Sequence, residues 1–200
     1  MRKLVLASTS SYRASALERL GLSFEMADPA VDETPLPGEA ADSLALRLAH
    51  AKAAAVADRF DDAIVIGSDQ VGICAGRLLH KPGSGAKAIE QLCSLSGKNA
   101  EFYSAVAVHD ATSGRREGQT VCTRLTFRAI STAAATHYVS QDNPIDCAGS
   151  FKVESLGLAL FHKVQADDPS ALIGLPVIAL LDQLSAYDIN PLQPPLVAAR

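Results

Sequence analysis

An unbroken apolar run, Ala-Ile-Val-Ile at residues 63–66, limits the fold more than any other segment of the chain. A strand with one face in water alternates polar and apolar residues, whereas a strand covered on both faces is apolar throughout. The run therefore predicts a central strand at 63–68, in a sheet covered by helices. Asp69 follows directly and places a carboxylate at the end of a buried strand, where α/β sheets build their sites.

Strand and helix patterns alternate along the rest of the chain, without internal repeats. Two long strands joined through 110–118 predict an antiparallel hairpin, so we expect an α/β fold with a mixed sheet and flanking helices. The remaining strands are predicted at 3–7, 23–27, 71–75, 78–80, 101–109, 119–128 and 156–164, with a hairpin turn at Gly76-Arg77, and the helices at 11–20, 42–59, 84–95 and 131–140, with a last helix whose first residue is Pro176.

Composition restricts the class of protein. The 200 residues are 48% hydrophobic and 20% charged, which suffices for one sizeable core. No linker divides the chain, so we expect a single domain over 1–200, with two lobes around a cleft as an alternative. A net charge of −4 with 5% aromatic residues argues against a nucleic-acid polymer as partner. The longest apolar stretch near the C-terminus, 169–181, is shorter than the roughly 20 residues that span a bilayer. The N-terminal apolar run ends at Ala7, so we expect no signal peptide and a cytoplasmic location.

Several familiar motifs fail. The four cysteines and five histidines lack the spacing of zinc ligands. Residues 83–88, Gly-Ser-Gly-Ala-Lys-Ala, match a dinucleotide-binding fingerprint, but they do not follow a long first strand. The pair Ser84 and Lys87 lacks the companion motifs of serine–lysine hydrolases. Nucleophilic-serine chemistry therefore has little support.

The segment Ser8-Thr9-Ser10-Ser11-Tyr12-Arg13 is more informative. It follows a predicted strand and opens a helix, so free backbone N–H groups, hydroxyls and one guanidinium should gather there. These are the groups that bind a phosphate. The alternative is that Ser10 or Ser11 caps the helix and Arg13 is solvated.

Four charged residues strengthen the phosphate interpretation. Glu33 lies in a proline-bracketed loop, Lys52 in an alanine-rich helix, Asp69 at a strand end and Lys81 before a proline. Each alone is also consistent with a structural or surface role. Together, two carboxylates for a divalent cation and three cations for phosphate oxygens indicate a hydrolase of nucleotide polyphosphates.

The order of the motifs resembles the Maf family of nucleotide pyrophosphatases over nearly the whole chain. The segments that carry the resemblance are LASTSSYR, VDET, AHAKAAA, IGSDQV, HKP, SLSGK, DCAGSFKVE and GLPV. The resemblance implies an elongated mixed sheet with a central cleft, as in inosine-triphosphate pyrophosphatases. It also implies metal-dependent cleavage of a nucleoside triphosphate to the monophosphate and pyrophosphate.

The resemblance implies a role for individual residues of this chain. Asp69 matches the catalytic proton acceptor, and with Glu33 it is expected to hold Mg²⁺ or Mn²⁺. Two positions depart from the family: Ala14 replaces a frequent second arginine, and His80 replaces a frequent glycine. The residues that match the lining of the triphosphate are Ser8, Ser10, Arg13, Lys52 and Lys81.

Three positions bear on which nucleobase of the substrate is recognised. Tyr12, Gln70 and Glu154 resemble the branch that hydrolyses 7-methyl-GTP, which has an aromatic residue, glutamine and glutamate there. An aromatic face attracts the cationic N7-methylated ring, and a carboxylate accepts from N1–H and N2–H of guanine. A dTTP/UTP pyrophosphatase of the same family, or a non-catalytic nucleotide-binding regulator of septum formation, is the alternative. The expected partner is a small-molecule nucleotide; a homodimer stays open.

Overall fold

The computed structural model describes residues 2–193, which contain a seven-stranded mixed sheet in the order β2-β1-β3-β5-β6-β7, with β4 beside β3. The first strand, β1 (Lys3–Ala7), is parallel to β2 (Glu25–Met26) and to β3 (Ala63–Cys74). The other pairings are antiparallel and join β3 to β4 (Arg77–Leu79) and to β5 (Asn99–Asp110), β5 to β6 (Arg116–Phe127), and β6 to β7 (Phe161–Gln165). The predicted mixed α/β sheet is confirmed.

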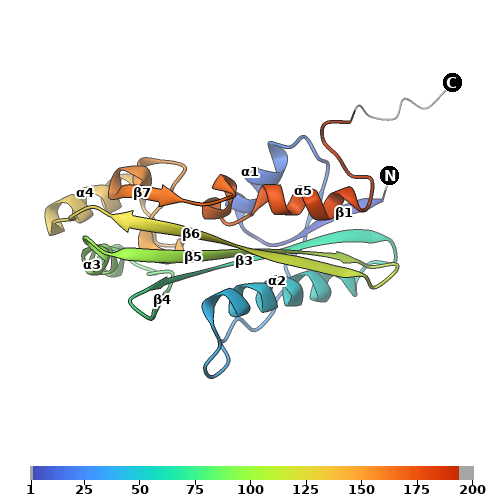
Figure 1. The fold of residues 1–200 in the computed structure, drawn as a ribbon, viewed down its shortest axis with the longest axis horizontal. Coiled ribbons are helices and arrows are strands. Elements are labelled where there is room, and N and C mark those ends of the chain that lie inside the picture. Colours follow the sequence, from blue (N-terminus) through green and yellow to red (C-terminus); the bar gives the residue numbers. More distant parts are fainter. Residues whose placement is uncertain (1, 194–200) are drawn as a thin grey trace.

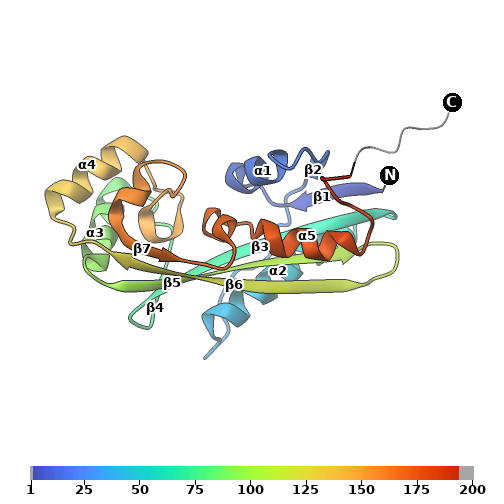
Figure 2. The same cartoon turned by 45° about the horizontal axis from the view of Figure 1, so that its top comes forward.

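Helices cover both faces of the elongated sheet (Figures 1 and 2). On one face lies α2 (Ala41–Ala57). On the other lie α1 (Ser11–Glu18) and α5 (Val177–Ser185), whose Leu17 and Leu180 pack with Ile64 and Ile66. At one end, α3 (Gly85–Leu95) and α4 (Thr132–Asp142) close a second core around Phe102. Three 3₁₀ turns complete the described chain: η1 (Ala148–Ser150), η2 (Leu156–Leu160) and η3 (Pro169–Ile173).

One edge of β3 is interrupted. It pairs with β1 over Ala63–Gly67 and with β4 over Gly72–Cys74, whereas the opposite edge pairs with β5 from Ile64 to Cys74. Residues 68–71 therefore have no neighbouring strand on the β1 and β4 side. This gap leaves the middle of β3, including Asp69, without a strand beside it at the place where β1 ends.

Alternation along β3 sends successive side chains to opposite faces of the sheet. Val65 packs with α2, and a methyl group at Gly67 would overlap the backbone of Ala49 and Ala53 in that helix. The helix backbone therefore lies directly against the strand at Gly67. Asp69 continues on the same face toward α2, while Ser68 and Gln70 point toward η3.

Four predicted boundaries were wrong. The strands at 63–68 and 71–75 form one strand, because β5 pairs with the whole of it. The following turn lies at Ala75 and Gly76, both with positive φ (50° and 75°), one residue before the predicted position. Pro176 precedes α5 instead of opening it. The strand predicted at 156–164 begins only at Phe161, because the chain turns back at Gly157, whose N–H donates to the carbonyl of Lys152.

Within residues 2–193, none of the helices combines the length and the apolar character needed to cross a bilayer.

Candidate active site

A cavity of about 480 Å³ opens at the gap in the sheet. It is bounded by the segment after β1, the loop before α2, the middle of β3, and the segments around η1 and η3. All ten site residues predicted from the sequence line it, although they come from six separate segments of the chain. They are Ser8, Ser10, Tyr12, Arg13, Glu33, Lys52, Asp69, Gln70, Lys81 and Glu154.

Lys52 links the two carboxylates of the site. Its Nζ lies 2.6 Å from Oδ1 of Asp69 and 2.5 Å from Oε1 of Glu33. Lys52 and Asp69 are buried, whereas the Glu33 side chain is more than half exposed. The close approach of α2 to β3 at Gly67 makes this contact, because it brings the helix within reach of the strand. The structure thus makes Lys52 a counterion of the carboxylates as well as a lining residue.

The two carboxylates differ in their electrostatic setting. Burial raises the pKa of Asp69 above its ordinary value, against the opposing charges of Lys52 and Arg13. Burial also acts on Glu33, but the hydrogen bond and charge of Lys52 outweigh it and lower the pKa of that carboxyl. The upward shift of the Asp69 pKa suits a group that accepts a proton, whereas the pKa of Glu33 shifts the other way.

The helix start after β1 has both the capping and the cationic groups expected of it. Ser10 is the N-cap of α1, and its Oγ accepts from the backbone N–H of Arg13 at 3.5 Å. Arg13 is half-buried rather than solvated: its Nε donates to the carbonyl of Gly174 at 3.0 Å, and its Nη1 to Oγ of Ser8 at 3.4 Å. Arg13 is therefore hydrogen-bonded within the protein rather than solvated, and the helix start that Ser10 caps also lines the cavity.

Tyr12 and Glu154 line the same cavity from α1 and from the segment after η1. The hydroxyl of Tyr12 donates to Oδ2 of Asp146 at 3.3 Å, and Nζ of Lys152 lies 5.7 Å from the ring centroid. Lys152 does not line the cavity itself, although its ammonium lies against this ring. Burial raises the pKa of the Tyr12 hydroxyl.

Gln70 is hydrogen-bonded to other residues around the cavity. Its Nε2 lies 2.8 Å from Oγ of Ser104, 3.1 Å from the carbonyl of Ala171 and 3.2 Å from that of Leu172. With its donors engaged by η3, the side chain can offer a ligand its acceptor oxygen. The structure therefore gives Gln70 a positioning role that the comparison of sequence motifs did not predict.

Sequence reasoning missed several supporting residues. Ser68 Oγ lies 2.8 Å from the carbonyls of both Ala105 and Gly174, and Ser104 donates to the carbonyl of Ala171 at 2.6 Å. Lys152 lay inside the motif at 146–154, which was the available signal. No comparable signal marks Ser104, because its partner lies far away in the sequence.

The carboxylates fit a divalent cation. Within residues 2–193, no group of three or more His, Cys, Asp or Glu side chains is placed to hold a metal ion. Mg²⁺ needs no such cage, since one or two carboxylates with substrate phosphates and water commonly bind it. Glu33 and Asp69 both contact Nζ of Lys52, which makes these two carboxylates the candidates to hold a cation that arrives with a substrate.

Known proteins resemble this chain over most of its length. A protein of Aromatoleum aromaticum named 7-methyl-GTP pyrophosphatase is 51% identical over 184 residues, 92% of this chain and 95% of that one. A protein of Bordetella avium with the same name is 49% identical over 193 residues, 96% of this chain and 97% of that one. A solved structure, the Staphylococcus aureus Ham1 protein, matches at a TM-score of 0.45 and 14% identity, over 92% of this chain and 97% of that chain.

The family comparison covers nearly the whole chain. A protein-family model described as Maf-like protein matches residues 3–187, which include every residue of the cavity described above. The match thus takes in all five helices and all seven strands of residues 2–193. This chain belongs to the Maf-like protein family.

Proposed function

We propose that this protein is a nucleoside triphosphate pyrophosphatase that hydrolyses 7-methyl-GTP to 7-methyl-GMP and pyrophosphate. The observation that carries the proposal is the cavity of about 480 Å³ at the gap in the sheet, where three cationic side chains line the same space as the Glu33 and Asp69 carboxylates that Lys52 joins. The names of relatives that are about half identical to this chain support the same substrate. Product analysis tests the cleavage position, because 7-methyl-GMP and pyrophosphate should form in equal amounts, without 7-methyl-GDP.

The chain supplies a base and a set of cations. We assign Asp69 to accept the proton of the attacking water, because burial at the gap in the sheet raises the pKa of this carboxyl, whereas Lys52 lowers that of Glu33. Arg13, Lys52 and Lys81 face the phosphate oxygens and stabilise negative charge that builds on them as the bond to pyrophosphate breaks. The backbone N–H groups at the start of α1 and the hydroxyls of Ser8 and Ser10 complete the cradle.

We further propose that Glu33 and Asp69 hold Mg²⁺ or Mn²⁺ when the nucleotide binds. Such an ion would neutralise phosphate charge and lower the pKa of a bound water. Lys52 then has a second role, because its ammonium offsets the repulsion between the two carboxylates in the free protein.

Base recognition rests on Tyr12, Gln70 and Glu154. A carboxylate at Glu154 accepts from both N1–H and N2–H of guanine, a pattern that uracil and thymine lack. The Tyr12 ring attracts a cationic methylated base by about 0.5–2 kcal/mol. The ammonium of Lys152, 5.7 Å from the ring centroid, helps to hold the ring in place. The oxygen of Gln70 is fixed by the hydrogen bonds of its amide group.

Lys81 gives a clean test of the phosphate cradle, because its side chain is exposed and makes no ion pair within residues 2–193. Lys81→Ala should lower kcat/KM by roughly 10–150-fold, as expected for loss of a charged hydrogen bond. The melting temperature should not change. Lys163→Ala, which removes an exposed lysine of β7, is the matched control and should leave kcat/KM unaltered. A fall in melting temperature with unchanged kcat/KM would mean that Lys81 is structural.

Glu154→Gln tests base recognition. An amide can accept only one of the two guanine hydrogen bonds and turns a donor toward the other. The preference for 7-methyl-GTP over dTTP should therefore fall by roughly tenfold, while turnover of dTTP stays nearly constant. The measurement is the ratio of kcat/KM for the two nucleotides, with Glu18→Gln as control. An unchanged ratio would remove Glu154 from base recognition.

The two alternatives differ from this proposal in measurable ways. A dTTP/UTP pyrophosphatase would release pyrophosphate from pyrimidine nucleotides at least as fast as from 7-methyl-GTP. A non-catalytic regulator would bind nucleotide without turnover. The presence of Asp69, Lys52 and Lys81 together in one cavity favours an enzyme over the second alternative.

A further inference from the structure

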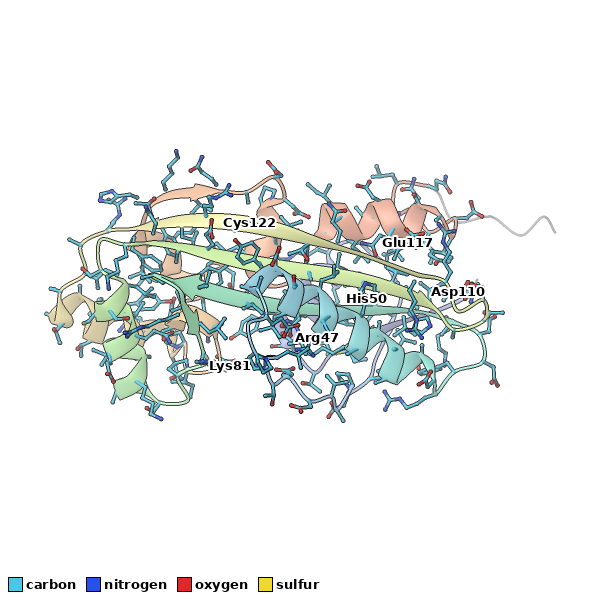
Figure 3. The ribbon with its side chains drawn as sticks, turned by 60° about the horizontal axis from the view of Figure 1, so that its bottom comes forward. Arg47, His50, Lys81, Asp110, Glu117 and Cys122 are labelled. Carbon is cyan, nitrogen blue, oxygen red and sulfur yellow. The ribbon has the colours of Figure 1, made fainter. Side chains whose placement is uncertain are left out.

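A second cavity, of about 770 Å³, adjoins the active site and shares Lys81 with it. It lies between the β3–β4 hairpin and α3. Figure 3 shows Lys81 between α3, at one end of the sheet, and α2. We call it the α3 groove; it is lined by residues 74–75, 77–82, 87, 90–91, 94–95 and 98.

The rim of the α3 groove is cationic. Arg77, Lys81, Lys87 and Lys98 line it and are exposed, against one carboxylate, Glu90. Among residues 2–193, none of these five side chains takes part in an ion pair. A protein whose net charge is −4 thus gathers four unpaired cations around one hollow, which favours an anionic ligand.

Apolar side chains also line the α3 groove, beside the polar Gln91 and Ser94. Leu95 and Pro82 are buried, and Leu78 and Leu79 of β4 are half-buried. Cations together with aliphatic and hydrogen-bonding side chains suit a nucleotide, whose phosphates contact the cations while its base packs on the leucines. Inorganic phosphate would contact only the cations.

The position of Lys81 relates the groove to the reaction. Lys81 lines both cavities, so the α3 groove meets the active-site cavity at this side chain. With the base beside Tyr12 and Glu154 and the α-phosphate beside Asp69, the terminal phosphate would extend toward Lys81, which lines both cavities. Any group attached to the terminal phosphate would pass Lys81 and enter the α3 groove.

We propose that the α3 groove is a second nucleotide subsite, so that the protein also cleaves dinucleoside polyphosphates that have a 7-methylguanosine at one end. This rests on the proposed function, because it uses the same site for the methylated end. Water would attack the α-phosphorus beside 7-methylguanosine, and its bond to the bridging oxygen would break. For a methylated diguanosine triphosphate, one water would yield 7-methyl-GMP and GDP, with the released proton passing to solvent through Asp69.

The test compares 7-methyl-GTP with the methylated diguanosine triphosphate, using the wild-type protein and Arg77→Ala/Lys98→Ala. Both replaced side chains are exposed and lie outside the active-site cavity. The matched control is Arg19→Ala/Lys163→Ala, which removes two exposed cations that line neither cavity. For each protein, kcat/KM is measured with both substrates, together with GDP binding by calorimetry and the melting temperature.

We expect wild-type kcat/KM for the dinucleotide to be within about tenfold of that for 7-methyl-GTP. The groove variant should lose about tenfold with the dinucleotide and less than about twofold with 7-methyl-GTP, since two exposed cations each contribute modestly. The control should change neither value. Cleavage of 7-methyl-GTP without cleavage of the dinucleotide, an equal loss with both substrates, or GDP binding in the groove without dinucleotide cleavage would overturn the inference. Failure to cleave 7-methyl-GTP itself would instead overturn the proposed function.

Discussion

Asp69→Asn will reduce kcat by about 10²–10⁴-fold, the usual contribution of a positioned base, while the protein stays folded. The amide keeps an oxygen that can accept from Lys52, so the buried contact between α2 and β3 survives in part. What the amide loses is the ability to take a proton from water. The measurement is pyrophosphate release at saturating 7-methyl-GTP, together with the melting temperature.

A matched variant separates this effect from a general loss of negative charge. Asp182 is exposed on α5, and Asp182→Asn should keep kcat within about twofold, since isolated surface substitutions have small effects. If Asp69→Asn retained more than about a tenth of wild-type kcat, Asp69 would not be the base. Another group of the cavity would then have to accept the proton. Glu33, the other carboxylate that pairs with Lys52, would be the next candidate.

Removal of divalent metal should abolish turnover. The three cationic side chains of the cavity leave much of a triphosphate's charge to be neutralised, and the proposed divalent ion would supply the rest. Dialysis against EDTA should reduce pyrophosphate release to background, and added Mg²⁺ or Mn²⁺ should restore it. Melting temperatures of the dialysed and reloaded protein serve as the control for folding.

Glu33→Gln refines the metal prediction. The variant keeps the side chain's size but offers a weaker ligand, so a higher concentration of Mg²⁺ should be needed for half-maximal activity. Full activity of the wild-type protein in EDTA would contradict the metal assignment. It would leave Lys52, Arg13 and Lys81 as the whole of the charge stabilisation.

Much of the fold was predictable because its signals are local. The apolar run at 63–66 indicated a central strand, and the serine-rich segment after β1 indicated a helix start. The gap beside residues 68–71 was not predictable, because it depends on where two other strands end. The break at Gly157 likewise depends on a contact with the backbone of Lys152.

The candidate site divides in the same way. Asp69, Glu33 and Lys81 could be singled out from the sequence, because these charged residues lie at a strand end, in a proline-bracketed loop and before a proline. All three line one cavity. The bond between Lys52 and both carboxylates depends on the close packing that Gly67 permits, which no spacing along the chain reveals. Gln70 was predicted for base choice, but its contacts with η3 arise only in the folded chain.

The central claim is the identity of the substrate. The most direct measurement is kcat/KM for pyrophosphate release from 7-methyl-GTP, GTP, dTTP and UTP under identical conditions with Mg²⁺. We predict a preference for 7-methyl-GTP over dTTP and UTP of well over tenfold, since a pyrimidine offers Glu154 one N–H donor instead of two and lacks the positive charge that the Tyr12 ring attracts. Hydrolysis of dTTP or UTP as fast as 7-methyl-GTP would contradict the assignment of Tyr12, Gln70 and Glu154, and no pyrophosphate release from any of the four would contradict the enzyme itself.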